Sequence, residues 1–247
     1  MQAVCKKRVT AIVLLAIAPI VQTLAIAILN SLLVSFLAYT LMVCVGTTVL
    51  VAILLWGKPD TSSRAAMLGV STVKKDQLVL GLLIGFAIDA IMVLGFWLFY
   101  KVFSDAEAVR AVAGRLGIRG GIYLWIAVSG LVVNAVAEEF FWRGCPHALL
   151  GLVPDGNGKK LFGPLQHGAL ARVLIVSLFF GMNHVGIMLT IAPSLPAALL
   201  SLLGIFLSGA FWSLLRESTK SLIPSLVSHV LVTLGYSGLL VFYFSIA

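Results

Sequence analysis

LLVSFLAYTLMVCVGTTVLVAILLW, residues 32–56, is an apolar stretch without a charged residue. A bilayer whose hydrocarbon core is about 30 Å thick is crossed by about 20 consecutive apolar residues in a helix. Backbone polar groups in lipid must be hydrogen-bonded within the protein, and the sequence has no alternating pattern typical of a transmembrane barrel. Residues 32–56 are therefore predicted to form a transmembrane helix.

Apolar runs of similar length lie on both sides of this stretch. They cover residues 9–29, 78–100, 122–143, 173–190, 195–215 and 222–246. The first run follows Lys6, Lys7 and Arg8, as a secretory signal would, but it exceeds the ~7–15 apolar residues of a signal core. We keep it as a helix and expect an all-α, polytopic membrane bundle of about seven transmembrane helices.

The composition excludes a soluble protein. Hydrophobic residues make up 61% of the 247 residues and charged residues 11%, and the mean hydropathy is +1.11. A soluble domain has roughly 25% charged residues. The net charge of +8 is spread over helix ends without interleaved aromatic residues, so nucleic acid is not an expected partner. Cys5, Cys44 and Cys145 are odd in number and far apart, which predicts no disulfide framework.

The basic residues predict an orientation in the membrane. With a cytoplasmic N-terminus, the cytoplasmic segments hold Lys6, Lys7, Arg8, Lys58, Arg64, Lys74, Lys75, Arg143, Lys159, Lys160, Arg172, Arg216 and Lys220. The external segments hold only Lys101, Arg110, Arg115 and Arg119. The positive-inside rule therefore favours a cytoplasmic N-terminus and an external C-terminus.

The chain is expected to be one membrane domain with two parts. Residues 1–121 contain no motif and are predicted to be scaffold helices, whereas residues 122–247 hold most of the intramembrane polar residues and form the expected catalytic core. Polar loops are predicted at residues 101–121 and 151–168. No internal repeat is evident, so the inverted-repeat architecture of many transporters is not supported.

A group of charged residues ends the run at residues 122–143. Glu139 and Arg143 are four residues apart on one helix face, where an ion pair lowers the cost of desolvating both. Glu138 is rotated about 100° from Glu139 and is expected to remain unpaired. Gly144 and Pro146 predict the end of the helix. The alternative is an interfacial charge cluster in which Arg143 reaches toward water.

Two histidines lie in the apolar runs that follow. His184, taken alone, is explained by a hydrogen bond to a backbone carbonyl, and His229 by hydrogen bonding between helices. Together with Glu138 they place titratable groups on three helices, and these groups must point into the bundle, into a shared cavity between the C-terminal helices. One carboxylate and two imidazoles suffice for hydrolysis, with a base for water and donors for the oxyanion. Glu138, His184 and His229 are also a possible zinc ligand set.

These residues resemble a known family. AEEFFWRG, residues 137–144, resembles the EExxxR motif of the CAAX prenyl protease and bacteriocin-processing family, also called the Abi family. Phe180 to His184 resembles its FxxxH motif, and His229 to Thr233 falls where its HxxxN or HxxxD motif is expected. Residues 216–224 resemble its turn between the last two helices. Thr233 departs from the family pattern, which has Asn or Asp there.

The resemblance implies a glutamate-type intramembrane endopeptidase that cuts near the C-terminus of a lipidated or membrane-anchored peptide or protein. It implies that Glu138 and His184 activate water, and that His229 and Thr233 stabilise the oxyanion. Glu139 and Arg143 match supporting positions. The implied location is the inner or plasma membrane of a prokaryote. The alternative function is a catalytically silent membrane scaffold or a bacteriocin-immunity protein.

A few polar residues have less certain roles. Asn134 lies one turn before Glu138 and is a candidate for orienting it. Asp89 is expected to hydrogen-bond between helices, and His147 and His167 to be solvated. Neither His184 nor His229 has a carboxylate one turn away to act as a second-shell acceptor, which predicts a site that needs no metal or other cofactor.

Overall fold

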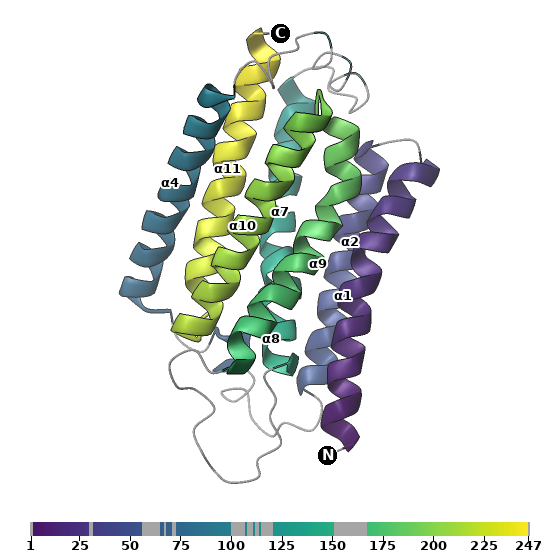
Figure 1. Ribbon diagram of the computed structural model, residues 1–247, viewed down its shortest axis with the longest axis vertical. Helices are drawn as coiled ribbons and strands as arrows, with labels where there is room; N and C mark the ends of the chain where they lie inside the picture. The colour runs from purple at the N-terminus through teal and green to yellow at the C-terminus, as the bar shows by residue number, and fades with distance from the viewer. Residues whose placement is uncertain are drawn as a thin grey trace.

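The computed structural model is an all-helical bundle, and no strand occurs among the residues it describes (Figure 1). It describes residues 2–29, 32–55, 65, 66, 68–70, 73–99, 107, 111, 114, 121–150 and 167–246. The seven long helices are α1 (Gln2–Leu29), α2 (Leu32–Leu55), α4 (Lys75–Leu98), α7 (Gly121–Glu138), α9 (His167–Ile191), α10 (Leu195–Thr219) and α11 (Ile223–Ile246). The π-helix η1 (Glu139–Gly144) and the short helix α8 (Cys145–Leu150) continue α7. The expected all-α fold is confirmed.

The helices have the length and surface of a membrane protein. Among the described residues, three helices are long and apolar enough to cross a bilayer, namely Lys75–Leu98, Gly168–Thr190 and Leu195–Thr219, and shorter apolar helical stretches lie in α1, α2 and α11. Large apolar side chains such as Leu83, Ile91 and Leu98 are well exposed on α4. Such a surface is stable against lipid and not against water.

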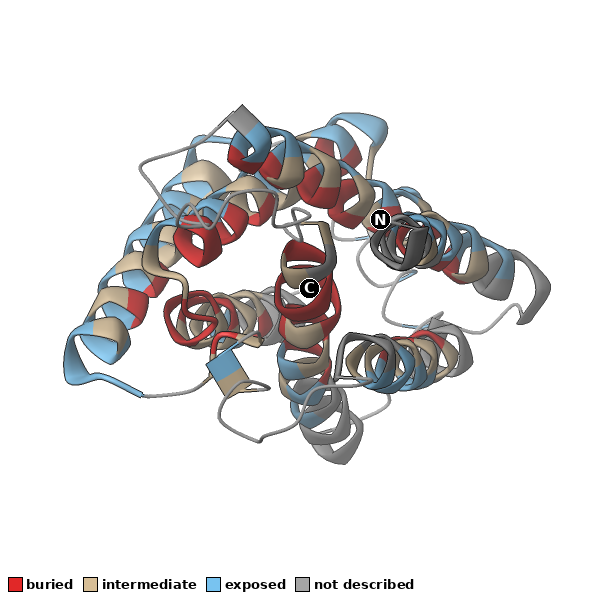
Figure 2. Cartoon of the chain, turned by 90° about the horizontal axis from the view of Figure 1, so that it is seen from below, coloured by how far each residue is buried: buried red, intermediate tan, exposed pale blue. Residues whose placement is uncertain are grey.

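Six of the helices form a closed ring. α11, α10, α9, α1, α2 and α7 each contact the next, and α7 contacts α11 again, while α4 packs outside against α11. Seen from below, buried residues lie toward the inside of the bundle and exposed ones outside (Figure 2). The N-terminus of α1 and the C-terminus of α11 lie at opposite ends (Figure 1). η1 contacts α2, α9, α10 and α11, so the predicted acidic residues lie inside the ring.

The helix that carries His229 is fixed from outside by glycines on α4. A Cβ added at Gly81 would lie 2.8 Å from both the Pro224 carbonyl oxygen and Val227 Cβ, and one added at Gly85 would lie 2.8 Å from Leu231 Cδ1. Small residues four apart let two membrane helices approach closely. α4 therefore sets the position of α11.

Asp89 lies at the same interface, between two helices as expected. Its carboxylate packs against Gly235 of α11, and its Oδ1 atom is buried without a hydrogen-bond partner among the described residues. Gly235 offers only helical backbone, whose polar groups are already bonded within the helix. For Oδ1 the expected hydrogen bond is therefore not found in the part of the chain that the structure describes.

Two helix boundaries differ from those expected. The helix does not end at Gly144 but passes through η1 into α8, with the Cys145 N–H donating to the Phe140 carbonyl five residues back. Pro146 has no N–H and would crowd the carbonyl of Trp142 in a regular helix, and the wider π turn before it absorbs this conflict. α9 begins at His167 rather than at Val173, which explains how His184 reaches deep into the bundle.

The last predicted turn is present. α10 ends at Thr219, Lys220 is left-handed with φ of 55°, and α11 begins at Ile223. The predicted loops at residues 101–121 and 151–168 lie almost entirely outside the described residues.

Candidate active site

The predicted ion pair forms the base of the site. Arg143 Nη1 donates to Glu139 Oε1 at 3.2 Å, and both side chains have an exposed fraction of 0%. Arg143 Nη2 donates to the Gly209 carbonyl at 3.4 Å, and the guanidinium lies 4.1 Å above the centre of the Phe180 ring. Arg143 does not reach toward water, so the alternative of an interfacial charge cluster is wrong.

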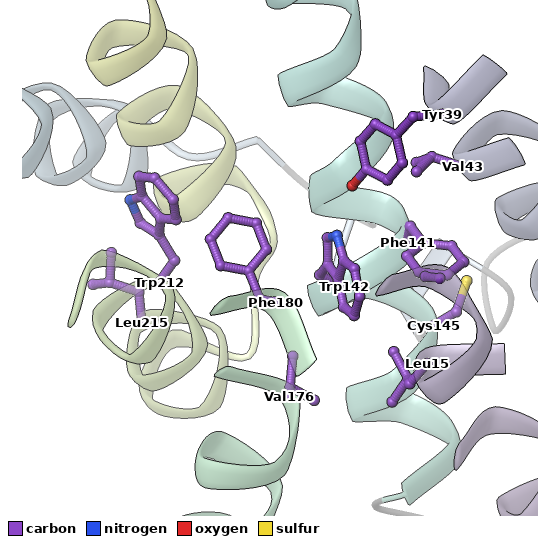
Figure 3. Close-up of a cluster of buried hydrophobic side chains, with 11 residues drawn as sticks. Leu15, Tyr39, Val43, Phe141, Trp142, Cys145, Val176, Phe180, Trp212 and Leu215 are labelled. Atoms are coloured by element: carbon purple, nitrogen blue, oxygen red, sulfur yellow. The ribbon is translucent and has the colours of Figure 1, made fainter. Parts of the chain in front are cut away.

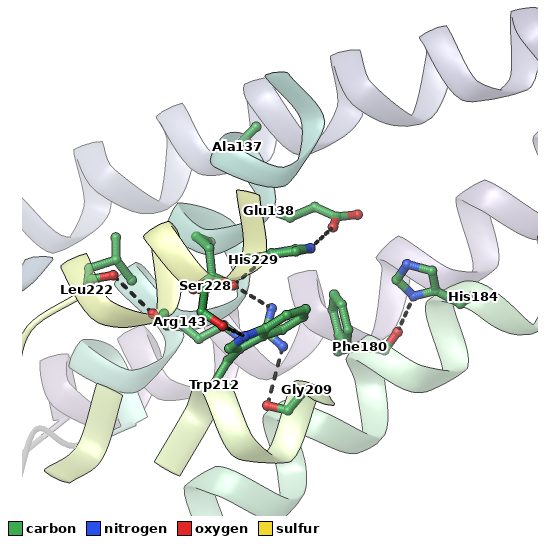
Figure 4. Close-up of polar contacts among 12 residues, drawn as sticks. Ala137, Glu138, Arg143, Phe180, His184, Gly209, Trp212, Leu222, Ser228 and His229 are labelled. Carbon is green, nitrogen blue, oxygen red and sulfur yellow. Dashed lines mark hydrogen bonds and ion pairs between the residues drawn. The ribbon is translucent and has the colours of Figure 1, made fainter. Parts of the chain in front are cut away.

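His229 contacts both carboxylates, and Figure 4 shows its ring beside Glu138. Its Nδ1 is 3.0 Å from Glu139 Oε1, and its Nε2 is 3.7 Å from Glu138 Oε2. An ionised carboxylate can only accept, so Nδ1 carries a proton and donates it to Glu139. The ring stacks on Trp212 at 4.1 Å between centroids, and the Trp212 N–H donates to the hydroxyl of Ser228. Glu139 thus fixes His229 so that Nε2 faces Glu138.

Glu138 is not unpaired as the sequence suggested. The hydroxyl of Tyr39 on α2 donates to Glu138 Oε1 at 2.7 Å, and the side-chain amide of Asn183 on α9 donates to the same hydroxyl at 2.7 Å. Glu138 is 3% exposed. Sequence reasoning missed Tyr39 and Asn183. A tyrosine inside an apolar helix was the available signal, because a buried phenol needs a hydrogen-bond partner.

His184 is held by its own helix. Its Nδ1 lies 2.8 Å from the Phe180 carbonyl, and because a carbonyl only accepts, Nδ1 donates to it. The backbone hydrogen bond expected for a lone histidine is confirmed. The Phe180 ring lies 4.7 Å from the His184 ring and 6.1 Å from the His229 ring. Figure 4 shows His184 with its ring directed toward the side of the site where Glu138 lies.

Asn134 and Thr233 are less closely engaged. The Asn134 side-chain oxygen accepts from the hydroxyl of Thr40 at 3.2 Å, and the contacts of the described residues include no hydrogen bond from Asn134 to Glu138. Thr233 is half-buried, and its hydroxyl has no hydrogen-bond partner among the described residues. Its carbonyl accepts from Ser237 at 2.7 Å.

Aromatic rings surround these polar groups. Trp142, Phe180 and Trp212 pack edge to face, with ring centroids 5.9 Å and 6.1 Å apart in turn (Figure 3). Such packing limits the access of water to the charges and strengthens their interactions. The FxxxH spacing has a structural reason here, because one residue supplies both a ring for Arg143 and a carbonyl for His184.

His147 is buried, which corrects the expectation that it is solvated. Its Nδ1 lies 2.8 Å from Glu217 Oε1, and Arg172 and Lys220 also donate to that carboxylate. Burial lowers the pKa of His147, an effect that Glu217 opposes. A carboxylate on α10 therefore binds α8 to α9, just after η1. The His167 side chain lies outside what the structure describes.

The nearby cysteine is not a nucleophile candidate. Cys145 follows η1 directly and is fully buried. Its thiol packs among apolar side chains of the core, away from the electropositive, partly exposed setting that activates a cysteine.

The geometry bears on metal binding in two ways. Within the described part of the chain, no group of three or more His, Cys, Asp and Glu side chains is arranged to hold a metal ion. The sequence argument for a metal-free site is nevertheless flawed, because Glu139 and the Phe180 carbonyl do supply second-shell acceptors to His229 and His184. Metal independence therefore stays a prediction.

The fold and site together define a polytopic membrane protein with a buried cluster of carboxylate and imidazole groups. Residues 120–235 match the sequence model of the family described as type II CAAX prenyl endopeptidase, Rce1-like. This segment is slightly under half of the chain and contains Glu138, His184 and His229, and the match confirms the resemblance drawn from the motifs. No curated protein and no solved structure matches the chain.

Substitution of Gly209 by alanine should disrupt the base of the site. A Cβ at this position would lie 2.7 Å from Phe180 Cδ1 and 3.2 Å from Arg143 Nη2, both held in the packed core. Overpacking of this kind costs about 1–3 kcal/mol, so thermal unfolding of purified Gly209→Ala in detergent should occur at a lower temperature.

The matched control is Gly204→Ala on the same helix, because a Cβ there meets nothing within 4 Å. This variant should unfold at or above the wild-type temperature, since alanine favours helix by about 1 kcal/mol over glycine. Equal unfolding temperatures for the two variants would contradict the close approach at Gly209.

Proposed function

We propose that the protein is an intramembrane endopeptidase that hydrolyses a peptide bond near the C-terminus of a lipidated or membrane-anchored peptide or protein. The observation that carries the proposal is the position of Glu138, whose Oε2 faces His229 Nε2 at 3.7 Å, in a chain matched by a CAAX prenyl endopeptidase family. In this proposal, residues 122–247 are the catalytic core of a single membrane domain.

Glu138 is the better base of the two carboxylates. Glu139 Oε1 accepts from both Arg143 and His229, and these donors stabilise its charged form and make it a poorer base. Glu138 has one oxygen bound to Tyr39 and the other directed at His229, with no arginine bonded to it. Glu139 and Arg143 have a supporting role, since they orient His229.

The proposed reaction proceeds in two steps. Glu138, with His184 Nε2, takes a proton from water as the water oxygen bonds to the scissile carbonyl carbon. The resulting oxyanion is stabilised by His229 Nε2–H and by the Thr233 hydroxyl. Glu138 then returns the proton to the leaving nitrogen, and the C–N bond breaks to give a carboxylic acid and an amine. Water is the only co-reactant.

Substitution of the base should abolish cleavage. In proteoliposomes, a fluorescence-quenched farnesylated peptide with a C-terminal CAAX sequence should be cut by the wild type. Glu138→Gln and His184→Ala should each lower the rate by about 10²–10⁴, the usual contribution of a general acid or base. The unfarnesylated peptide tests whether the lipid is required. Cleavage at the wild-type rate by both variants would overturn the proposal in favour of a scaffold or immunity protein.

The matched control is Asp89→Asn. It also turns a carboxylate inside a helix into an amide, but Asp89 lies on α4 against Gly235, away from the site. It should cleave as the wild type does. A chelator added to the same assay tests metal dependence: we expect no change in rate, and loss of activity restored by zinc would instead assign Glu138, His184 and His229 as metal ligands.

Thr233 is proposed to supply the second oxyanion donor. Its hydroxyl lies one turn after His229 and is not engaged by the described residues. Thr233→Val should slow turnover by up to about 10²–10³, the usual effect of losing one oxyanion donor, without loss of folded protein. Thr233→Asn should retain or raise activity, because the longer amide still donates. A wild-type rate for Thr233→Val would exclude this role.

The protein is an integral membrane protein, and we propose that the bundle end that holds α8 faces the cytoplasm of a prokaryotic cell. At that end α2 ends, α4 and α9 begin, and α10 turns into α11, so the helix ends that flank the segments predicted to be basic lie together (Figure 1). A reporter fused within residues 151–168 should be cytoplasmic, and an external reporter would reverse the orientation.

A further inference from the structure

The N-terminal helices contribute a residue to the site. Tyr39 lies on α2, outside the segment 120–235 that matches the endopeptidase family, yet its hydroxyl is 2.7 Å from Glu138 Oε1. Tyr39 is 2% exposed, so its hydroxyl bonds to protein groups and not to water at the surface. Tyr39 and Glu138 are separated by 99 positions in the sequence and meet only because α2 packs beside α7 and η1.

The direction of the hydrogen bonds at the Tyr39 hydroxyl follows from which of the neighbouring groups can donate. The Asn183 amide donates to the Tyr39 oxygen at 2.7 Å. A phenol has one proton, and it must go to the group that can only accept, which is the Glu138 carboxylate. Asn183, Tyr39 and Glu138 therefore form a chain of hydrogen bonds with a single polarity.

This chain leaves the two oxygens of Glu138 in different environments. Oε1 is bound to Tyr39, whereas Oε2 faces His229 Nε2 at 3.7 Å. The terminal torsion of a glutamate is broad, so without Tyr39 the carboxylate could turn and present either oxygen. A base must present its lone pair to water in one defined direction.

We propose that Tyr39 is a positioning residue for the base, fixed by Asn183, and that it directs Glu138 Oε2 toward the water to be activated. This inference rests on the proposed function, because it takes Glu138 to be the base. It assigns a catalytic contribution to the part of the chain that precedes the family match. Tyr39 itself touches neither the water nor the scissile bond in this account.

The test measures kcat and KM separately for the farnesylated CAAX peptide in proteoliposomes. A hydrogen bond to a charged group corresponds to about a 10- to 100-fold effect, so Tyr39→Phe should lower kcat by that factor and leave KM essentially unchanged. Asn183→Leu should lower kcat less. Because Asn183 acts through the Tyr39 oxygen, adding Asn183→Leu to Tyr39→Phe should cause no further loss of kcat.

The matched control is Thr47→Val, also on α2. The Thr47 hydroxyl lies 3.5 Å from the Ala137 carbonyl, so this variant also removes one hydroxyl between α2 and α7 but none at Glu138. It should keep the wild-type kcat. A role of Tyr39 in helix packing alone would leave kcat unchanged in folded Tyr39→Phe, or would make the losses of Tyr39→Phe and Asn183→Leu add, and either result overturns the inference.

Glu138→Gln in the same series separates the two proposals. If Glu138→Gln is inactive and Tyr39→Phe has the wild-type kcat, only the role of Tyr39 fails. If Glu138→Gln still cleaves, the proposed function fails, and the assignment of Tyr39 fails with it.

Discussion

Two adjacent carboxylates inside a membrane protein must be neutralised, and the arrangement of the helices around η1 meets that need. Glu138 and Glu139 are both almost fully buried, where an unpaired charge is very costly. Arg143 supplies one positive charge from the same helix, and His229 on α11 lies within reach of both carboxylates. The charged cluster thus depends on the position of α11 as well as on the EExxxR motif.

The π-helix η1 allows one short segment to direct side chains toward several neighbouring helices. In η1, Glu139 and Arg143 remain close enough for an ion pair, while Phe141 and Trp142 turn into the aromatic core. A π turn is tolerated where surrounding contacts compensate for its poorer hydrogen bonding, and such turns occur often at functional sites. Here the compensation comes from the helices of the ring, because η1 contacts α2, α9, α10 and α11. The Glu217 network then holds α8, directly after η1, against α9 and α10.

Local contacts were predictable from the sequence, and contacts between distant segments were not. The Glu139 to Arg143 pair and the His184 to Phe180 bond both join residues four apart, so helical geometry alone predicts them. His229 meets Glu139 across 90 positions, and Asn183 meets Tyr39 across 144. Apolar periodicity says little about such contacts, because a membrane helix is apolar on every side and does not reveal which face packs inward. For this reason the sequence did not identify Tyr39 as the partner of Glu138, or Glu139 as the partner of His229.

The proposed reaction moves one negative charge over a short distance within the site. When Glu138 takes a proton from water, it becomes neutral, and the negative charge that it carried reappears on the oxyanion. His229 Nε2, which faces Glu138 Oε2 at 3.7 Å in the resting site, is close to both locations of that charge. The His229 ring therefore keeps a negative partner at each stage, and Glu139 continues to hold its Nδ1. In a site walled by Trp142, Phe180 and Trp212, where water cannot screen a net charge, moving one charge over a short distance costs less than creating one. On this view the second glutamate keeps His229 in place while the first takes up and returns the proton.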